Sequence, residues 1–242
     1  MVHTFSGTVC GMEVDGSTVS VAMVHDDVLA QTEFFADASP EELRAILKTA
    51  SEQSLVRGDV LFREGDDSDA LYVVLTGRVA VAIANPIDNR ETMVGLMTPG
   101  DLFGEMPMLD QGARSANARA LEPSSVLAIP YAGIVSMFNA NPALLWGVTR
   151  LLAGRLRETN EALADSVFLD VTGRTAKRLL ELADGRDTFI LPVTQEELAG
   201  MVGASRERVN KAIASFIRLG WLDQHDRRYT INMRDRLELR SR

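Results

Sequence analysis

The chain has 242 residues, of which 46% are hydrophobic, and a formal net charge of −9. That length suits two domains, and the apolar fraction excludes a disordered protein. No segment approaches the roughly 20 consecutive apolar residues of a membrane-spanning helix.

Other features of composition exclude further classes of protein. The N-terminus lacks a basic segment followed by an apolar block, so no secretory signal is expected. The single cysteine, Cys10, excludes an intramolecular disulfide, an iron–sulfur cluster and a structural thiolate zinc site. We therefore expect a soluble, cytoplasmic protein with no metal site and no membrane partner.

The charge is unevenly distributed along the chain. Residues 171–242 contain 14 Lys and Arg against 10 Asp and Glu, a net charge of +4, which leaves −13 for residues 1–170. A locally basic segment is what attraction to phosphate requires, whatever the total charge. The C-terminal third is therefore a candidate for contact with nucleic acid.

Residues 1–25 are rich in Ser, Thr, Gly and Val. The segment Val14-Asp15-Gly16-Ser17 lies between alternating stretches and is compatible with a hairpin. An irregular extension, or translation that begins at Met12 or Met23, explains the same segment equally well.

Residues 26–140 begin with short helices and continue as short strands. Ser39-Pro40-Glu41-Glu42 combines an N-cap, a proline in the first turn and acidic residues, so a helix is predicted to start there. Strands are predicted around residues 59–62, 71–75, 79–83, 93–97 and 125–129, separated by turns that contain Gly and Asp. Closely spaced short strands of this kind favour a sandwich or jelly roll.

Residues 141–168 have the pattern of one long helix. Apolar residues recur at spacings of three and four; they are Leu145, Val148, Leu152, Leu156, Leu163 and Val167. A helix of about 40 Å with a narrow apolar seam favours a parallel dimer interface. The alternative is that the seam packs on the chain's own sheet.

Residues 194–211 carry the most informative local pattern. Thr194 and Glu197 form a capping box at the start of a helix, and Gly203 permits the positive φ that ends it. Ser205 then caps a second helix. A helix, a tight Gly turn and a capped helix predict a helix-turn-helix.

The outward face of the second helix carries residue types that read base edges. With the cap Ser205, the predicted DNA-contacting residues there are Arg206, Glu207, Asn210 and Lys211. Two short strands are predicted at 221–222 and 229–231, forming a wing in which Arg227 and Arg228 meet phosphate.

A second candidate site lies in the strand-rich part. A phosphodiester requires a guanidinium, small donors and backbone N–H groups, which Gly104, Arg114 and Ser115 supply, and Glu105 would accept from a sugar hydroxyl. The long helix adds Arg155, Thr159 and Asn160 on or beside its seam, where polar groups need partners.

These motifs resemble the cyclic-AMP receptor protein / fumarate-nitrate regulator (CRP/FNR) family, over roughly residues 28–240. The matching segments are FGEM and ARSANARA within 103–120, RLRETNEALADSVFLDVTGR at 155–174 and TQEELAGMVGASRERVNKAI at 194–213. The last two look most like the cyclic-AMP-binding branch and its actinobacterial members. The resemblance implies an α+β chain with a cyclic-nucleotide-binding jelly roll (cupin-like) at 26–140, a dimerisation helix and hinge at 141–169, and a winged helix-turn-helix at 170–242.

The resemblance also implies roles for individual residues. Glu105, with the Gly104 backbone beside it, would hold the ribose 2′-hydroxyl of cyclic AMP and be supported by Arg155. Arg114 and Ser115 would hold the cyclic phosphate. Thr159 would meet the adenine in its own subunit and Asn160 the adenine of the partner. The implied partners are a second copy of the chain, double-stranded DNA with a palindromic TGTGA-type site, and RNA polymerase.

Two other functions remain to be compared with cyclic-AMP regulation. The first is a regulator of the same fold that binds DNA without cyclic AMP, or that responds to another ligand or to oxidation of Cys10. The second is an enzyme acting on cyclic nucleotides, which the motifs disfavour because they contain neither a metal-ligand cluster nor a nucleophile–base pair. A haem sensor is also disfavoured, because the only histidines are His3, His25 and His225.

Overall fold

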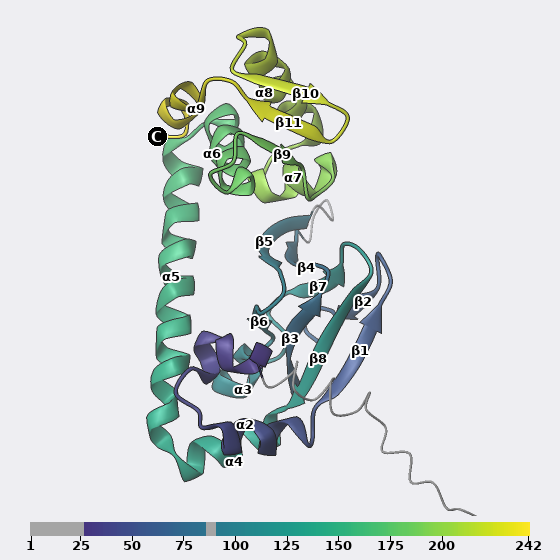
Figure 1. Cartoon of the computed structure of the whole chain (residues 1–242), viewed down its shortest axis with the longest axis vertical. Coiled ribbons are helices and arrows are strands. Elements are labelled where there is room, and N and C mark those ends of the chain that lie inside the picture. Colours follow the sequence, from purple (N-terminus) through teal and green to yellow (C-terminus); the bar gives the residue numbers. More distant parts are fainter. Residues whose placement is uncertain (1–26, 86–90) are drawn as a thin grey trace, which may run out of the picture.

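The computed structural model describes residues 27–85 and 91–242, so the hairpin considered at residues 14–21 lies outside the described residues. Figure 1 shows a strand-rich unit, the long helix α5 running along its side, and a smaller unit at the C-terminal end of that helix. We call the strand-rich unit with its covering helices the sensor unit, and the smaller unit, residues 170–242, the reading unit.

The sensor unit contains two four-stranded antiparallel sheets, which confirms the predicted sandwich. The first sheet has the order β1 (Ser51–Leu55), β8 (Ser124–Pro130), β3 (Ala70–Thr76), β6 (Leu102–Phe103). The second has the order β2 (Val60–Phe62), β7 (Asn117–Ala120), β4 (Val79–Ala84), β5 (Glu91–Met97). Strands β1, β6 and β7 were not among the predicted strands, because they are short or exposed and acquire strand geometry from their neighbours.

Strand β3 lies at the centre of the sensor core. Its alternating side chains enter two different clusters, because successive residues of a strand point to opposite faces. Leu71 and Val73 pack against the helices, whereas Tyr72 and Val74 pack between the two sheets. Burial on both faces explains why the strand is almost continuously apolar.

Short helices cover the outer face of the first sheet. They are η1 (Glu33–Phe35), α2 (Pro40–Leu47), α4 (Tyr131–Ala140) and η2 (Pro142–Leu144). The predicted start of α2 is confirmed, because Ser39 and Glu42 form a complete capping box. A further short helix, α3 (Met106–Asp110), follows β6.

Helix α5 (Leu145–Phe168) has one apolar face on the sensor unit and one in solvent. Gly147 lies where a Cβ atom would be 2.8 Å from the carbonyl oxygens of Glu33 and Phe34, so the close approach of α5 to η1 requires glycine. Val148 is buried against the sensor unit, which differs from its predicted place in the seam. The exposed apolar side chains of α5 are Leu145, Trp146, Leu152, Leu156, Leu163, Val167 and Phe168.

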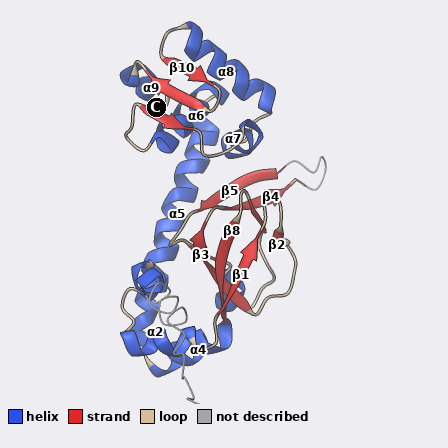
Figure 2. Cartoon of the chain, turned by 45° about the vertical axis from the view of Figure 1, so that its right-hand side comes forward, coloured by secondary structure: helices blue, strands red, loops and turns tan. Residues whose placement is uncertain are grey.

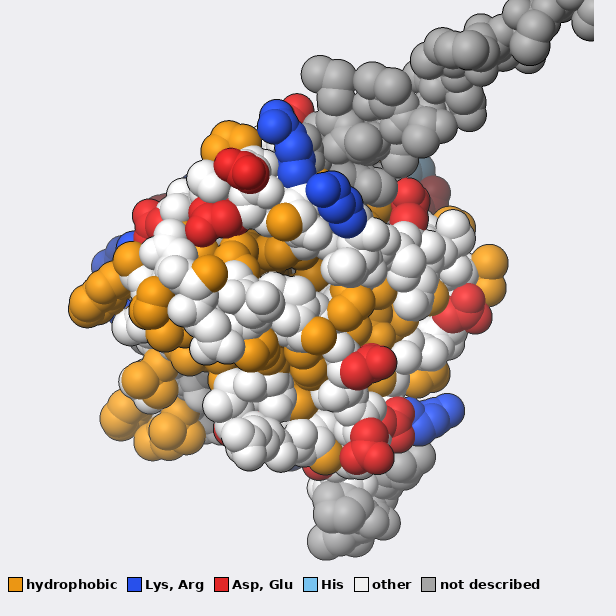
Figure 3. All heavy atoms as spheres, turned by 90° about the horizontal axis from the view of Figure 1, so that it is seen from below, with side chains coloured by type: hydrophobic (Ala, Val, Ile, Leu, Met, Phe, Trp, Pro, Cys, Tyr) orange, Lys and Arg blue, Asp and Glu red, His pale blue; other side chains and the backbone are white. Residues whose placement is uncertain are grey.

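Hydrophobic side chains lie at the surface at the end of the molecule where α5 begins (Figure 3). Among the exposed residues near this end are Val135 of α4 and Trp146, whose exposed fraction is 66%. Exposed apolar residues therefore extend beyond the part of α5 that lies beside the candidate ligand site.

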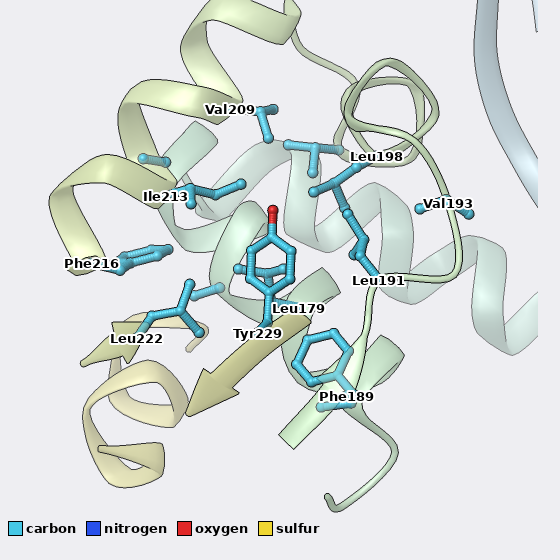
Figure 4. Packing of buried hydrophobic residues seen from close by; sticks show 14 of the residues in the cluster. Leu179, Phe189, Leu191, Val193, Leu198, Val209, Ile213, Phe216, Leu222 and Tyr229 are labelled. Carbon is cyan, nitrogen blue, oxygen red and sulfur yellow. The ribbon is translucent and has the colours of Figure 1, made fainter. Parts of the chain in front are cut away.

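The reading unit combines helices with a three-stranded sheet. Its elements are α6 (Val171–Ala183), β9 (Thr188–Ile190), α7 (Gln195–Val202), α8 (Arg206–Arg218), β10 (Leu222–His225), β11 (Arg228–Ile231) and α9 (Arg234–Arg240). Figure 4 shows its core, where Leu179, Leu198 and Val209 surround the ring of Tyr229. Strand β9 pairs with β11 and was not predicted.

Two residues separate α5 from α6, the first helix of the reading unit. Helix α5 ends at Phe168, Leu169 is extended, and Asp170 caps α6 by accepting from the backbone N–H of Gly173 at 2.8 Å. Arg174 donates to the carbonyl of Leu169 at 2.7 Å, which ties this junction to α6.

Candidate functional site

Glu105 and Arg155 form a partly buried ion pair between the sensor unit and α5. Glu105 precedes α3 and is 1% exposed, and its Oε1 accepts from Nη1 of Arg155. Arg155 also donates to the carbonyl of Leu102. The second carboxylate oxygen of Glu105, Oε2, is buried and has no hydrogen-bond partner among residues 27–85 and 91–242.

The Arg114 side chain is buried close to Glu105, where hydrogen bonds hold its guanidinium group. Its Nη1 donates to the carbonyl of Gly104 and its Nη2 to that of Ala70, both at 2.7 Å. The guanidinium carbon lies 4.1 Å from the centre of the Phe62 ring and 5.4 Å from that of Tyr72, which are cation–π distances. Its Nε is buried without a partner in the part of the chain that the structure describes.

Tyr131, at the start of α4, is a contact of this site that the motifs did not reveal. Its hydroxyl donates to the carbonyl of Gly104 at 2.5 Å, accepts from Nη1 of Arg114 at 3.2 Å and lies 3.1 Å from Oγ of Ser68. Burial raises the pKa of Tyr131, so the hydroxyl stays protonated and can donate. Gly104 has φ +79°, and a Cβ there would be 2.5 Å from Nη1 of Arg114, so glycine is required.

The remaining predicted ligand residues lie nearby but point into solvent. Ser115 is exposed and donates to Sδ of Met106 at 3.4 Å. Thr159 and Asn160 are exposed on α5, one turn after Arg155, and Thr159 donates to the Arg155 carbonyl at 2.8 Å. The structure therefore brings Gly104, Glu105, Arg114 and Arg155 into contact, and leaves Ser115, Thr159 and Asn160 free to meet a molecule from outside.

The buried polar atoms indicate the chemistry that the site suits. A carboxylate oxygen without a donor can accept from a hydroxyl, and a guanidinium N–H without an acceptor can donate to an oxyanion. Burying either atom unpaired is costly, so a molecule that satisfies both would be stabilised. Two guanidinium groups beside one carboxylate also leave a net positive charge, which suits a phosphodiester.

The helix-turn-helix is confirmed as predicted. Thr194 and Glu197 form the capping box of α7, and Gly203 ends α7 with φ +67°. Ser205 caps α8 by accepting from the backbone N–H of Arg208. The inner face of α8 is buried, so its other face is left to solvent.

The predicted base-reading residues differ in exposure. Arg206 is exposed, and so are Glu207 and Lys211, which form an i,i+4 ion pair at 2.6 Å. The hydrogen bond from Lys211 lowers the pKa of Glu207. Asn210 is half-buried, and its Oδ1 is enclosed without a partner in the described ranges, so this oxygen is not presented to a base.

A shallow hollow of about 480 Å³ lies between the start of α6 and α8. Its charged lining residues are three cations, Arg174, Arg208 and Lys211, and one carboxylate, Asp170, so the lining is net positive; Thr172 and Ser215 add hydroxyl groups. Arg208 and Thr172 were not among the predicted DNA-contacting residues, although Arg208 lies beside them in the sequence. A basic hollow at the start of a helix suits a backbone phosphate.

The predicted wing forms, with a tighter turn than expected. His225 pairs with Arg228 in the ladder, so only Asp226 and Arg227 make the turn, and Asp226 has φ +54°. Arg227 and Arg228 are both exposed, and Arg227 also donates to the carbonyl of Leu191 at 2.9 Å.

Two family models match the chain: the cyclic nucleotide-binding domain over residues 52–141 and the Crp-like helix-turn-helix domain over residues 173–240. A CRP-like cAMP-activated global transcriptional regulator of Mycobacterium tuberculosis is 36% identical over 224 residues, covering 90% of this chain and 100% of that relative. The chain belongs to the CRP/FNR family. As a CRP/FNR protein it is a DNA-binding transcription regulator with a cyclic nucleotide-binding domain, and it is not an enzyme.

Other CRP/FNR proteins support the same placement. The cyclic AMP receptor protein of Thermus thermophilus is 32% identical over 179 residues, covering 74% of this chain and 82% of that relative. The solved structure of FixK2 from Bradyrhizobium japonicum has a TM-score of 0.71 at 22% identity and covers 80% of this chain and 98% of that chain. The second likeness shows the CRP/FNR fold alone.

The described residues of this CRP/FNR chain contain neither a membrane-spanning helix nor a group of metal ligands. No helix within 27–85 and 91–242 is long and apolar enough to span a bilayer. The same ranges hold no group of three or more His, Cys, Asp or Glu side chains placed to bind a metal ion.

Proposed function

We propose that this regulator binds cyclic AMP between the sensor unit and α5 and that the nucleotide modulates its DNA binding. The observation that carries the proposal is a pair of buried atoms, Oε2 of Glu105 and Nε of Arg114, neither of which has a hydrogen-bond partner within residues 27–85 and 91–242. One suits a ribose hydroxyl and the other a phosphate oxygen. Two relatives are named for cyclic AMP, which supports this choice of nucleotide.

Each residue of the proposed site has a distinct role. Glu105 and the Gly104 backbone hold the ribose 2′-hydroxyl, and Arg155 orients the Glu105 carboxylate. Arg114 and Ser115 hold the cyclic phosphate. Thr159 meets the adenine in its own subunit, and Asn160 reaches the adenine of the other subunit. The exposure of Ser115, Thr159 and Asn160 supports these roles, since each can turn to a ligand.

We propose that the working form is a homodimer joined along α5. Leu145, Leu152, Leu156 and Leu163 follow the spacing of three and four, with Thr149 and Thr159 at the intervening positions, and the four leucines are 40–64% exposed. Such a stripe favours a second, parallel helix. Residues 26–140 then act as sensor, 141–169 as dimerisation helix and hinge, and 170–242 as DNA-binding domain.

In the dimer, two α8 helices read the half-sites of a palindrome. Half-sites of a two-fold protein lie about 34 Å apart, one turn of the duplex. Arg206, Glu207 and Lys211 would read bases of a TGTGA-type half-site, while Ser205, Asn210, Arg227 and Arg228 complete the contact region. RNA polymerase is the further partner expected of such a regulator.

The test is a titration of the protein against a TGTGA-type palindrome and a scrambled duplex, with and without cyclic AMP, at two salt concentrations. We expect cyclic AMP to increase affinity for the palindrome more than for the scrambled duplex. Equal affinity for both duplexes under all conditions would contradict sequence-specific regulation by the nucleotide.

A second candidate is a regulator of the same fold that binds DNA without cyclic AMP or responds to another ligand or to oxidation of Cys10. The contacts of Arg114 with Gly104, Ala70 and Tyr131 favour it, because they order the site before any ligand arrives. Calorimetry with cyclic AMP distinguishes the candidates, since only the first requires heat of binding that saturates.

Replacing Tyr131 by Phe is expected to weaken cyclic-AMP binding about fivefold. The change removes a hydroxyl that orients both Gly104 and Arg114, and one such hydrogen bond contributes about 1 kcal/mol. Calorimetry measures the affinity for cyclic AMP. Tyr229→Phe is the matched control, because it also removes a tyrosine hydroxyl but lies in the reading unit, and it should bind cyclic AMP like the unaltered protein. Unchanged affinity in Tyr131→Phe would contradict its role in positioning Arg114.

Replacing Arg206 by Ala is expected to cost ~1–3 kcal/mol of binding at one base pair and to relax the base preference at that position.

Arg208→Ala is the comparison variant, because it removes an arginine from the same helix. Because Arg208 lines the basic hollow, its loss should weaken binding to all duplexes alike and reduce the salt dependence by about one phosphate contact. Competition against single-base variants of the palindrome separates the two effects; uniform weakening by Arg206→Ala would mean that Arg206 contacts phosphate only.

A further inference from the structure

The reading unit and the sensor unit share a hydrophobic cluster within one chain. Buried Ala80 and Leu121, with half-buried Met93 and Leu96, pack in the same cluster as the core of the reading unit. Figures 1 and 2 show the contact between β5 and α7. We call this contact the α7–β5 interface.

A polar contact extends the α7–β5 interface. Nη2 of Arg57, in the turn between β1 and β2, lies 3.5 Å from Oε1 of Glu197 on α7. The Glu197 side chain is only 9% exposed, and its other oxygen accepts from the backbone N–H of Thr194 at 2.6 Å. The sensor unit therefore contacts the same carboxylate that starts α7.

One row of the second sheet connects this interface to the proposed phosphate site. Asn117 of β7, two residues after Ser115, pairs with Ala82 of β4, and Ala82 pairs on its other side with Met93 of β5. Met93 in turn faces Gly200 of α7: a Cβ added at Gly200 would lie 3.9 Å from the Met93 Cβ. Strands β7, β4 and β5 thus connect the phosphate-binding segment to α7, and β7 and β5 lie two strand spacings apart, about 10 Å.

The α7–β5 interface leaves the reading face of α8 open. The Glu207 and Lys211 side chains are 76% and 74% exposed while α7 is docked. In Figures 1 and 2, α8 lies on the far side of the reading unit from β5. The contact therefore does not cover Glu207 and Lys211, two of the residues proposed to meet bases.

We propose that the α7–β5 interface is the surface by which each sensor unit holds its own reading helix in the orientation that binds a palindrome. The inference rests on the proposed function, because it assumes a dimer that reads two half-sites at a fixed distance. Without the interface, two residues between α5 and α6 would be the principal link to the sensor unit, and the two reading helices would lose their defined spacing.

A disulfide across the interface tests the proposal directly. The 3.9 Å separation at residues 93 and 200 matches the Cβ–Cβ distance of a disulfide, about 3.8 Å. The variant carries Met93→Cys and Gly200→Cys with Cys10→Ser, so that no other thiol competes. We expect a disulfide within one chain under mild oxidation, and affinity of the oxidised protein for the palindrome within about threefold of the reduced protein, well below typical allosteric couplings.

Two substitutions at Gly200 supply the opposite perturbation. Gly200→Ala fits, because its Cβ would be 3.5 Å from the Glu91 carbonyl oxygen, an ordinary contact. Gly200→Gln is also neutral and favours a helix, but its longer side chain must push α7 from β5. We expect Gly200→Gln to bind the palindrome at least about tenfold more weakly than Gly200→Ala, which is within the usual range of allosteric coupling. The two variants should have the same affinity for an isolated half-site, and the same affinity for cyclic AMP.

The outcomes separate failure of this inference from failure of the proposed function. The unaltered protein must prefer the palindrome over a scrambled duplex; if it does not, the proposed function fails. Given that preference, three results would each overturn the inference. They are failure of the cysteine pair to cross-link, loss of palindrome binding on oxidation that a reductant restores, and equal palindrome affinity of Gly200→Gln and Gly200→Ala. The second result would make the docked arrangement inhibitory.

Discussion

Replacing both Leu156 and Leu163 by Glu is expected to convert the proposed dimer into monomers and to abolish preference for a palindrome. The two side chains are 61% and 64% exposed in the single chain, so a second helix is needed to bury them. Each leucine that becomes fully buried contributes about 1.5–3 kcal/mol, and four leucines meet in a dimer. Four carboxylates in the same seam would repel one another as well.

Sedimentation at micromolar concentration measures the dimer, and palindrome binding measures its consequence. Leu239→Glu is the matched control, because Leu239 of α9 is 68% exposed but lies outside α5. It should leave the mass and the palindrome preference unchanged. A Leu156→Glu, Leu163→Glu protein that remains dimeric would place the interface elsewhere.

Replacing Arg114 by Leu is expected to lower affinity for cyclic AMP about 10- to 150-fold, since charged hydrogen bonds contribute about 1.5–3 kcal/mol. The same change removes the guanidinium donor from the carbonyls of Gly104 and Ala70, and only Gly104 keeps a donor, the Tyr131 hydroxyl, among the hydrogen bonds described for this site, so the thermal midpoint of the ligand-free protein should also fall. Non-specific DNA affinity without ligand should stay the same, because the reading unit is untouched.

Arg78→Leu separates loss of a sensor-unit arginine from loss of the ligand contact. Arg78 is ion-paired with Glu122 at 2.5 Å, away from the proposed nucleotide site, and its hydrogen bond is the main cause of the lowered pKa of Glu122. This variant should be less stable yet bind cyclic AMP like the unaltered protein. If calorimetry showed equal nucleotide affinity for Arg114→Leu and Arg78→Leu, the assignment of Arg114 to the phosphate would be wrong.

Structural elements that depend only on residues nearby in the sequence were predictable. The capping boxes at Ser39 and Thr194, the positive φ of Gly203 and the cap at Ser205 are all determined within a few residues, and all are present. The long helix likewise follows from its own periodicity and ends at Phe168.

Strands, burial and side-chain contacts that depend on residues distant in the sequence were less predictable. Strand β1 has the polar sequence SEQSL and no apolar alternation, so it is a strand because β8 pairs with it. Val148 and Leu152 share one sequence period, yet only the packing of α5 on η1 determines that Val148 is buried and Leu152 exposed. No local pattern indicated Tyr131 as a contact of Arg114, because the two residues meet through separate elements.

The sequence by itself determined the helix-turn-helix, the long amphipathic helix and the residue types of the ligand site, because caps, periodicity and motif spacing act over short distances along the chain. Only the tertiary structure decided that Glu105 and Arg114 each keep one buried polar atom without a partner in the described part of the chain, and that α7 packs on β5. Both facts depend on which surfaces meet after folding, and residues far apart in the sequence supply those surfaces.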